Sequence, residues 1–376
     1  MPSASLDARL AKAIVPDYFS VQMHLLHACN LTCAHCYDSA HPSLVMPPTA
    51  EILRRIDNIY ALGHQLGVVP DIHLSGGEPT LRRDLVQLVA HIVQTHEGDA
   101  LLFTNGTRLS RALAQQLWDA GLRFVQISLE GPQPQNDAVR GDGAFAKALA
   151  TLHMLAELGF RLTVSITVTA RNFPSLFDFV ASLDALALHF HIREVFAVGA
   201  GADLQAITPQ QRRQLADWAI AWQGQSTVGV EDPVHCSAAP AYARTQAGCV
   251  AGRNHFCVDV DGAVYPCRPL GYRVGHIDDL PAMWHGDVMT RLRHRQLNGQ
   301  CGQCQLRHNC GGCRVHALAA GDLFGADTRC FAAETGQLMT PLQTRVFRAS
   351  QELGWRLTQA RRTLAMLRGS DDATRL

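Results

Sequence analysis

The sequence lacks an excess of either charge. Its 33 lysines and arginines are balanced by 33 aspartates and glutamates over 376 residues, so the formal net charge at pH 7 is zero. Proteins that bind nucleic acids or acidic lipid surfaces generally have a basic excess. The composition therefore predicts no nucleic-acid partner.

Long apolar runs are also absent. No segment reaches the roughly 18 apolar residues of a membrane-spanning helix, and residues 1–20 have no continuous apolar stretch of the kind found in signal peptides. No long repeat or low-complexity tract is visible. We therefore expect no membrane partner and a cytoplasmic location.

Cysteine is missing from residues 37–235, although the chain has 12 cysteines in all. Three lie in residues 29–36 and the other nine in residues 236–330. A disulfide scaffold would spread its cysteines more evenly, and the cytoplasm keeps thiols reduced. The distribution favours metal ligation at two places in the chain.

The first half of the chain alternates short apolar runs with amphipathic helical stretches. Residues 50–67 show the helical pattern, because Ile52, Ile56, Ile59 and Leu62 recur on one face. Repeated β/α units of this kind predict an α/β fold with a parallel sheet. The predicted strands span residues 21–26, 71–75, 100–105, 124–130, 161–170 and 191–196. Six units are fewer than the eight of a closed barrel, so we expect a partial (β/α)6 barrel of the TIM type.

The second half has a different character. Residues 201–235 read as a linker with one helix capped by Thr208. Residues 236–333 are rich in glycine, cysteine and turn residues and would need metal to hold them together. We expect five segments: an N-terminal extension (1–20), the barrel (21–200), the linker and helix (201–235), the cysteine-rich domain (236–333) and a C-terminal helical tail (334–376).

The first cysteine group, Cys29-x3-Cys33-x2-Cys36, directly follows the first predicted strand. Loops at the carboxyl ends of strands carry the active sites of barrel-like α/β folds. Three thiolates are one short of a structural zinc site, unless His27 or His35 is the fourth ligand. A [4Fe–4S] cluster normally takes four cysteines, so three would leave one iron open to bind another molecule.

The stretch "CNLTCAHCY" resembles the signature of the radical S-adenosylmethionine (SAM) superfamily, in which an aromatic residue, here Tyr37, follows the third cysteine. The resemblance implies that the open iron chelates SAM and that an electron from the cluster cleaves it. The resulting 5′-deoxyadenosyl radical takes a hydrogen atom from the substrate. Such chemistry belongs to the cofactor, while the protein positions and shields it.

A second motif, Gly76-Gly77-Glu78-Pro79, ends the second predicted strand. Adjacent glycines let a ligand approach the backbone closely, and the carboxylate of Glu78 can accept from an ammonium group. The motif is similar to the GGEP element of the family, which implies contact with the amino group of SAM.

Three further matches concern the following strands. "FVQISLEGP" is similar to a family segment in which Ser128 would lie near the ribose or carboxylate of SAM. "NDAVRGDGAF" resembles an element in which Arg140 would pair with the SAM carboxylate, although Asn136 stands where the family has histidine. Asn105 of "FTNGT" is a family-like strand end or simply part of an Asn-Gly turn.

The second cysteine group surrounds a predicted hairpin at Asp261-Gly262, which delivers Cys267 at its end. On spacing, its C-x2-C pairs also suit two zinc-ribbon sites. The segment resembles a SPASM domain, which implies one or two auxiliary [4Fe–4S] clusters. The last two cysteines of its four-cysteine run, Cys310 and Cys313, have two residues between them, whereas the family usually has three. Carried over, the first cluster uses Cys249, Cys267 and Cys313, and the second uses Cys301, Cys304, Cys310 and Cys330.

Two cysteines fall outside that pattern. Cys257 is the nearest candidate for a fourth ligand of the first auxiliary cluster, with a buried structural cysteine as the alternative. Cys236 is interpreted as structural, or as a hydrogen-atom donor to a substrate radical. No role is assigned to any of the 18 histidines.

The resemblance implies an enzyme whose substrate is a peptide or protein, because SPASM members mostly modify these. The cysteine-rich end also resembles members that act on tetrapyrroles or small cofactor precursors. The first strand begins about 20 residues into the chain, so we expect a leader peptide to bind a separate peptide-recognition protein or the barrel mouth and the C-terminal tail. A flavodoxin- or ferredoxin-type reductant is expected. A zinc protein or an electron carrier is the remaining alternative, but an electron carrier has no use for an open iron.

Overall fold

The computed structural model describes residues 19–39, 46–233, 248–304 and 306–331. Its centre is a single sheet of ten strands. Seven parallel strands are neighbours in chain order: β1 (Ser20–His24), β2 (Asp71–Ser75), β3 (Ala100–Thr104), β4 (Phe124–Ser128), β5 (Arg161–Val168), β6 (His189–Glu194) and β7 (Thr227–Val230). All six predicted strands are confirmed.

The seventh strand corrects the prediction that residues 201–235 hold only a linker and a helix. β7 pairs with β6 in parallel, with Phe190 opposite Val228. It has four residues, one of them Gly229, which leaves too short a pattern to identify from sequence.

The predicted hairpin forms and extends the same sheet. β8 (His255–Val258) runs antiparallel to β9 (Ala263–Tyr265), which in turn pairs with β10 (Gly275–His276). β8 also pairs in parallel with β1. The first strand of the cysteine-rich segment therefore completes one side of the barrel sheet. The two ends of the sheet, β7 and β10, are not paired with each other, so the barrel is open.

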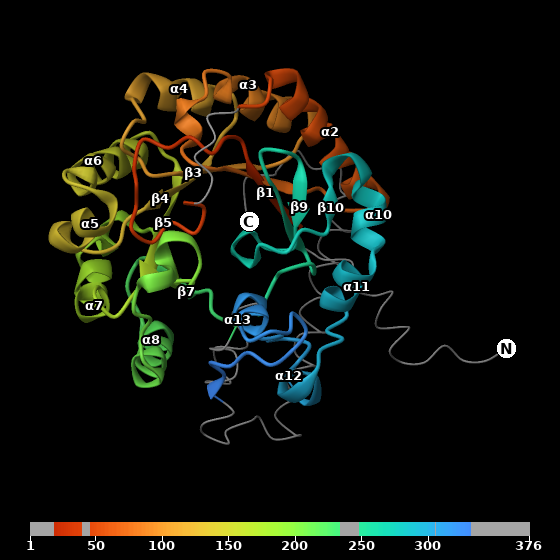
Figure 1. The fold of residues 1–376 in the computed structure, drawn as a ribbon. Helices are drawn as coiled ribbons and strands as arrows, with labels where there is room; N and C mark the ends of the chain where they lie inside the picture. Colours follow the sequence, from red (N-terminus) through yellow and green to blue (C-terminus); the bar gives the residue numbers. More distant parts are fainter. Residues whose placement is uncertain (1–18, 40–45, 234–247, 305, 332–376) are drawn as a thin grey trace, which may run out of the picture.

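Helices cover the outside of the curved sheet (Figure 1). They are α2 (Thr49–Leu66), α3 (Leu85–Ala90), α4 (Arg111–Asp119), α5 (Gln133–Arg140), α6 (Ala144–Glu157), α7 (Phe173–Ser182), α8 (Pro209–Ala221) and α10 (Leu280–His285). The helices α11 (Asp287–Arg293), α12 (Gly299–Gln303) and α13 (Arg314–Ala319) lie in the lobe below the sheet in Figure 1. The predicted cap of α8 is confirmed, because Thr208 and Gln211 form a reciprocal capping box.

The core lies between the sheet and these helices. The predicted face of α2 is fully buried there together with Val21 and Met23 of β1. Gln22, between those two strand residues, instead faces the interior of the barrel and lines a cavity. The period-2 alternation of the strand thus gives the barrel an apolar outer layer and a polar interior.

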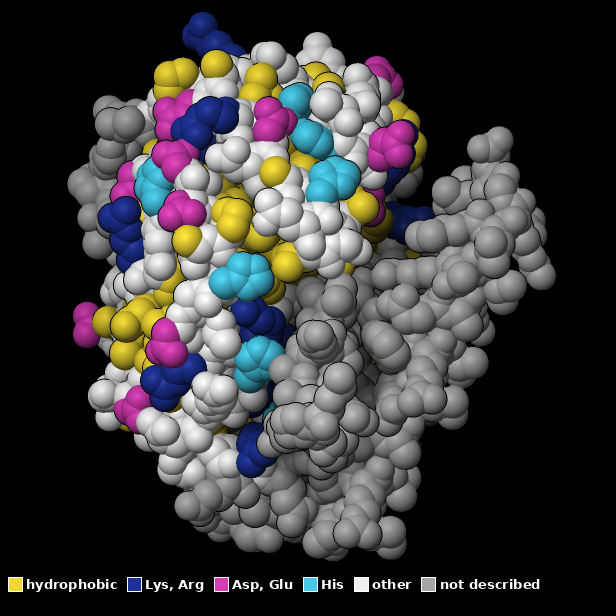
Figure 2. Space-filling model, turned by 90° about the vertical axis from the view of Figure 1, so that its right-hand side faces the viewer, with side chains coloured by type: hydrophobic (Ala, Val, Ile, Leu, Met, Phe, Trp, Pro, Cys, Tyr) yellow, Lys and Arg dark blue, Asp and Glu magenta, His cyan; other side chains and the backbone are white. Residues whose placement is uncertain are grey.

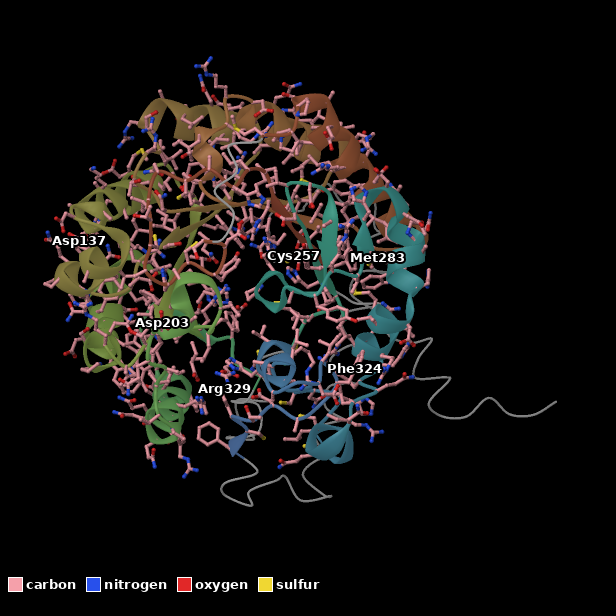
Figure 3. The ribbon with its side chains drawn as sticks, in the orientation of Figure 1. Asp137, Asp203, Cys257, Met283, Phe324 and Arg329 are labelled. Carbon is pink, nitrogen blue, oxygen red and sulfur yellow. The ribbon has the colours of Figure 1, made fainter. Side chains whose placement is uncertain are left out.

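Buried arginines attach the C-terminal lobe to the sheet. Arg329, labelled in Figure 3, lies 3.0 Å from Glu194 at the end of β6 and 2.9 Å from Asp232 after β7. Arg55 of α2 is 2% exposed and donates to the carbonyl of Val260 in the hairpin turn at 2.9 Å. Because buried charges are costly unless paired, these contacts fix the lobe against the barrel.

The face over α2 and α10 mixes apolar, acidic, basic and histidine side chains, without a broad area of one charge among its described residues (Figure 2). No helix among the described ranges has the length and apolar character needed to cross a membrane. The predicted C-terminal helix and Cys236 lie outside the described residues.

Candidate active site at the carboxyl ends of the strands

A cavity of about 620 Å³ opens at the carboxyl ends of the parallel strands. Loops after β1 and β2 and the ends of β3 and β4 meet there, as expected for a parallel barrel. Nine of the predicted site residues line this cavity: Cys29, Cys33, Cys36, Tyr37, Gly76, Gly77, Asn105, Ser128 and Arg140. Their positions span more than a hundred residues of sequence, and the fold brings them to one place.

The three cysteines of the first group lie together in this cavity, and no fourth cysteine is among its described lining residues. The pKa of the Cys33 thiol is raised to about 11, mainly by burial; Arg140 opposes the rise, and the neighbouring Cys29, Glu130 and Cys36 add to it. The thiols therefore ligate a metal only with release of their protons. The donor set fits a [4Fe–4S] cluster with one iron left open.

Neither histidine suggested as a fourth zinc ligand is directed at the thiols. His35 places Nε2 2.8 Å from a carboxylate oxygen of Glu130, and His27 places Nδ1 3.3 Å from Asp38. These contacts count against the zinc interpretation of the first cysteine group.

The two glycines of the GGEP element pack against the cysteine loop. A Cβ at Gly76, whose φ is +128°, would lie 2.4 Å from the carbonyl oxygen of Leu26. A Cβ at Gly77 would lie 2.1 Å from the carbonyl oxygen of Ala28. The glycines are therefore required for the close approach of this turn to the start of the cysteine loop.

Glu78 has a different environment from the one expected. Its side chain is fully buried and is not among the residues that line the cavity. One carboxylate oxygen accepts from the Thr80 hydroxyl at 2.7 Å and the Thr104 hydroxyl at 2.8 Å. The other accepts from the backbone amide of Asn105 at 2.8 Å. The carboxylate thus joins the β2 turn to the end of β3.

Glu130, directly after β4, is a site residue that the sequence analysis missed. Its carboxylate is 1% exposed, pairs with Arg140, and accepts from His35 at 2.8 Å and from the Thr167 amide at 2.6 Å. Burial alone would raise its pKa, but Arg140 and His35 outweigh burial and hold the pKa at about 2. The available signal was a carboxylate at a strand end in "SLEGP".

Arg140 and Asn136 of α5 both contact Glu130, Arg140 through its carboxylate and Asn136 through its backbone amide. Arg140 also reaches the cavity, with Nη1 3.8 Å from the Cys33 sulfur. Asn136 is fully buried and accepts from the Glu130 amide at 3.0 Å, so it caps the end of β4 and does not face the cavity.

A second, smaller cavity is lined by Cys301, Cys304, Cys310 and Cys330. Backbone amides approach three of these sulfurs at 3.4 Å: Leu306 to Cys304, Gly312 to Cys310, and Asp327 to Cys301. Amide donors of this kind stabilise and tune cysteine-ligated clusters. These four thiols are the set expected for the second auxiliary cluster.

The set expected for the first auxiliary cluster is also brought together. Burial raises the pKa of Cys267 well above its usual value, and the nearby thiols of Cys257 and Cys249 add to the effect. Burial likewise raises the pKa of Cys313, with Cys249 among the neighbours that contribute. Cys249 is therefore near both Cys267, after the hairpin, and Cys313, in the four-cysteine run.

Cys257 is fully buried on β8, with its sulfur 3.3 Å from His255 and 3.7 Å from Gln22. Figure 3 shows it inside the curve of the sheet, far from the outer helix that carries Asp137. This position agrees with a buried cysteine, and its nearness to Cys267 also keeps it a candidate ligand.

Below the cysteine loop, the barrel interior holds several titratable side chains. His191 and Arg193 of β6 pair with Glu231. Burial lowers the pKa of His73 on β2 from 6.5 to about 3, and that of His255 on β8 to about 4. Both imidazoles are therefore neutral at physiological pH.

The Glu130 pairing predicts a large loss of stability in Glu130→Gln, because the change leaves the buried Arg140 without its counter-charge. We expect the free energy of unfolding to fall by about 3 kcal/mol, measured by chemical denaturation. The matched control is Glu157→Gln, whose pair with Arg111 is exposed and which should lose less than about 1 kcal/mol. Equal losses in the two variants would contradict the account.

The low pKa of His73 predicts an acid-sensitive fold. Below about pH 6.5 the unfolded chain binds a proton at this position that the folded chain excludes, so stability falls as the pH drops from 6.5 toward 3. The variant His73→Gln should lose less stability than the wild type between pH 7 and pH 5. His64→Gln, on the exposed side of α2, should behave as the wild type does, and an identical slope in all three proteins would refute the prediction.

Comparison with known proteins agrees with this geometry. The model of the radical SAM superfamily matches residues 23–173, and that of an iron-sulfur cluster-binding domain, SPASM, matches residues 249–305. The mycofactocin maturase MftC of Mycobacterium ulcerans is 32% identical over 323 residues, which cover 81% of this chain and 86% of the relative. An AdoMet-dependent heme synthase of Methanosarcina barkeri is 28% identical over 345 residues, which cover 82% of this chain and 95% of the relative.

Among solved structures, the fold is similar to that of Streptococcus suis SuiB bound to S-adenosylmethionine. The TM-score is 0.68 at 18% identity, and the match covers 86% of this chain and 80% of SuiB. The same protein bound to its precursor peptide SuiA gives a TM-score of 0.67 at 17% identity. The expected partial barrel with a cysteine-rich domain is confirmed.

The cofactors expected from the sequence are confirmed as well, because the two matched domains are those that use SAM and [4Fe–4S] clusters. The chain is an enzyme that belongs to the radical SAM superfamily and carries a SPASM domain.

Proposed function

We propose that this enzyme modifies a peptide or protein by taking a hydrogen atom from it. The similarity to mycofactocin maturase at 32% identity carries the proposal. The fold shared with SuiB, whose structure includes a bound precursor peptide, supports it.

The character of the cavity also supports a peptide. Its strand-borne lining is dominated by amides, hydroxyls and charges: Gln22, Ser75, Gln126, Ser128, Ser165, Thr167 and Arg193. Such groups can bond to the amides of a peptide backbone. A tetrapyrrole presents two broad apolar faces, for which an apolar and aromatic wall is the better match.

The bound cluster and SAM supply the radical chemistry, and we propose specific tasks for this chain's residues. Cys29, Cys33 and Cys36 hold the cluster, and Tyr37, Gly76, Gly77, Asn105, Ser128 and Arg140 shape the SAM-facing wall. Glu78 and Glu130 hold that wall in place through buried hydrogen bonds. The surrounding barrel excludes water from the reactive species.

For the auxiliary clusters we propose the two thiol sets described above, with Cys257 completing the first set. A flavodoxin- or ferredoxin-type reductant, a separate peptide-recognition protein and a cytoplasmic location complete the proposal. The five sequence segments given above are proposed as the domain boundaries, with the barrel extended beyond residue 200 to include β7.

A tetrapyrrole or small cofactor precursor is the second candidate substrate. The observation in its favour is the match to heme synthase, which covers 95% of that relative.

The test measures 5′-deoxyadenosine formed by the anaerobically reconstituted enzyme with SAM, a reductant and host lysate. Half of the lysate is first treated with immobilised protease and filtered. We expect the lysate to stimulate product formation and protease treatment to abolish the stimulation, because the substrate is a peptide or protein. Stimulation that survives proteolysis would overturn the proposal in favour of the small-molecule substrate.

A further inference from the structure

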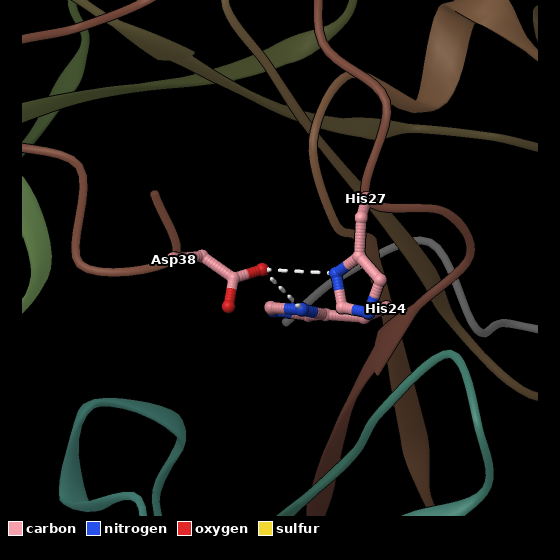
Figure 4. Close-up of side chains that lie close together, drawn as sticks. All are labelled: His24, His27 and Asp38. Atoms are coloured by element: carbon pink, nitrogen blue, oxygen red, sulfur yellow. Dashed lines mark hydrogen bonds and ion pairs between the residues drawn. The ribbon is translucent and has the colours of Figure 1, made fainter. Parts of the chain in front are cut away.

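Four polar side chains converge beside the cysteine loop, and we call them the His–Asp group: His24, His27, Asp38 and Asp259. His24 ends β1, His27 and Asp38 flank the cysteine loop, and Asp259 lies in the turn after β8. Figure 4 shows three of them, with both imidazoles directed at one oxygen of Asp38. Residues 24–38 and the turn that holds Asp259, more than 200 positions further along the chain, thus contribute donors to one point.

The distances between the donor atoms of this group match the distances between neighbouring ligand atoms around a bound metal ion. His24 Nδ1 lies 3.4 Å from Asp38 Oδ2 and 3.7 Å from Asp259 Oδ1, and His27 Nδ1 lies 3.3 Å from the same Asp38 oxygen. Bonds of about 2.0–2.1 Å to a tetrahedral ion place neighbouring ligand atoms about 3.3–3.4 Å apart. The donor atoms of His24, His27 and Asp38 all lie within 4.8 Å of one another.

His24 provides an independent observation. Its side chain is completely buried, and its Nδ1 has no hydrogen-bond partner. That nitrogen has carboxylate oxygens of Asp38 at 3.4 Å and of Asp259 at 3.7 Å, but neither is placed in hydrogen-bond geometry. Buried polar atoms without a hydrogen bond are rare in folded proteins, so this nitrogen indicates a partner from outside the protein, such as a metal ion.

The surroundings have the form of a second coordination shell. Arg268 Nη2 lies 2.5 Å from Asp38 Oδ1 and 3.0 Å from Asp259 Oδ2, the two oxygens that face away from His24. On the other side of His24, Nε2 lies 3.5 Å from the Tyr37 hydroxyl, whose oxygen can accept the ring proton. The side-chain amide nitrogen of Gln22 lies 3.3 Å from His24 Nε2, and a 180° flip of that amide would place its oxygen there as an acceptor. Such partners orient metal-bound imidazoles and carboxylates.

The charge balance also leaves room for a cation. Two carboxylates face one guanidinium, which leaves one negative charge in a nearly dry environment. Either a divalent cation or a protonated imidazole can neutralise it. A protonated His27 would pair with Asp38 through Nδ1, at 3.3 Å, and with Asp259 through Nε2, at 3.5 Å, but it would leave His24 Nδ1 without a hydrogen bond.

We propose that His24, His27 and Asp38 of the His–Asp group bind a divalent transition-metal ion, with Zn²⁺ the ion that best fits two imidazoles and one carboxylate. The ion joins the end of β1 to the cysteine loop, and Arg268, which pairs with both Asp38 and Asp259, connects it to the hairpin. Because His27 and Asp38 line the cavity, it also offers an open position to a carboxylate or thiolate of a substrate. The proposal holds whichever substrate class the enzyme uses.

A second group in the chain provides the matched control. Asp57, His91 and His96 also cluster, but Asp57 is 51% exposed and accepts directly from both imidazoles, at 2.7 and 2.8 Å. Hydrogen bonds already satisfy this surface group, so it has no need of an ion.

The experiment loads the full-length, cluster-reconstituted enzyme with ZnSO4, removes free ion by desalting, and measures zinc and iron per chain by mass spectrometry. We expect about one zinc in the wild type and in His91→Gln, and a loss of at least tenfold in His24→Gln and His27→Gln with iron unchanged. Unchanged iron shows that a variant is folded. Zinc that is absent from the wild type, or equal in all four proteins, would overturn the proposal.

X-ray absorption at the zinc edge distinguishes this site from zinc in an empty cysteine site. The proposal predicts a shell of nitrogen and oxygen atoms at about 2.0–2.1 Å without sulfur. A sulfur shell at about 2.3 Å would place the ion on cysteines and refute the proposal.

Discussion

The buried carboxylate of Glu130 is the contact on which the arrangement of the SAM-facing wall depends. It joins the end of β4 to the cysteine loop through His35, to α5 through Arg140 and to β5 through the Thr167 amide. A carboxylate with 1% exposure is stable only when all of these partners are in place. The four segments therefore have one relative position at the carboxyl end of the barrel, and the apolar core between the sheet and the helices supports the strands that carry them.

The same physical solution recurs where the C-terminal lobe meets the barrel. Arg268 pairs with Asp38 and Asp259, and Arg329 pairs with Glu194 and Asp232. A cysteine-rich lobe buries little apolar surface of its own, so paired charges and metal ligation replace a core as the source of its order. Through these pairs the hairpin and its cysteine are held at a fixed place beside the SAM-binding loop.

Much of this structure could be predicted from local patterns. Six strands, the α2 face, the cap of α8 and the hairpin at Gly262 follow from hydrophobic period and turn residues that are close in sequence. β7 could not be predicted because four residues with a central glycine give no clear period. The pairing of β8 with β1 joins residues more than two hundred positions apart, and no local pattern records it.

The site shows the same division. The thiols and glycines were identifiable because their spacing in sequence is itself the signal. The environments of Glu78, Glu130 and His24 depend on burial and on partners from other strands, so single-residue identity does not show them. The sequence shows Glu78 only as the acidic residue of the GGEP element, and the fold adds that its oxygens accept from Thr80, Thr104 and Asn105.

The most direct test of the account compares 5′-deoxyadenosine formation by the reconstituted wild type and Cys33→Ala, each with SAM and dithionite. The account predicts product from the wild type and none from the variant, which should lose about four irons with its SAM-binding cluster and keep the iron of the auxiliary sites. Product formation by Cys33→Ala at the wild-type rate, or a wild type that carries its full iron and never cleaves SAM, would contradict the central claim.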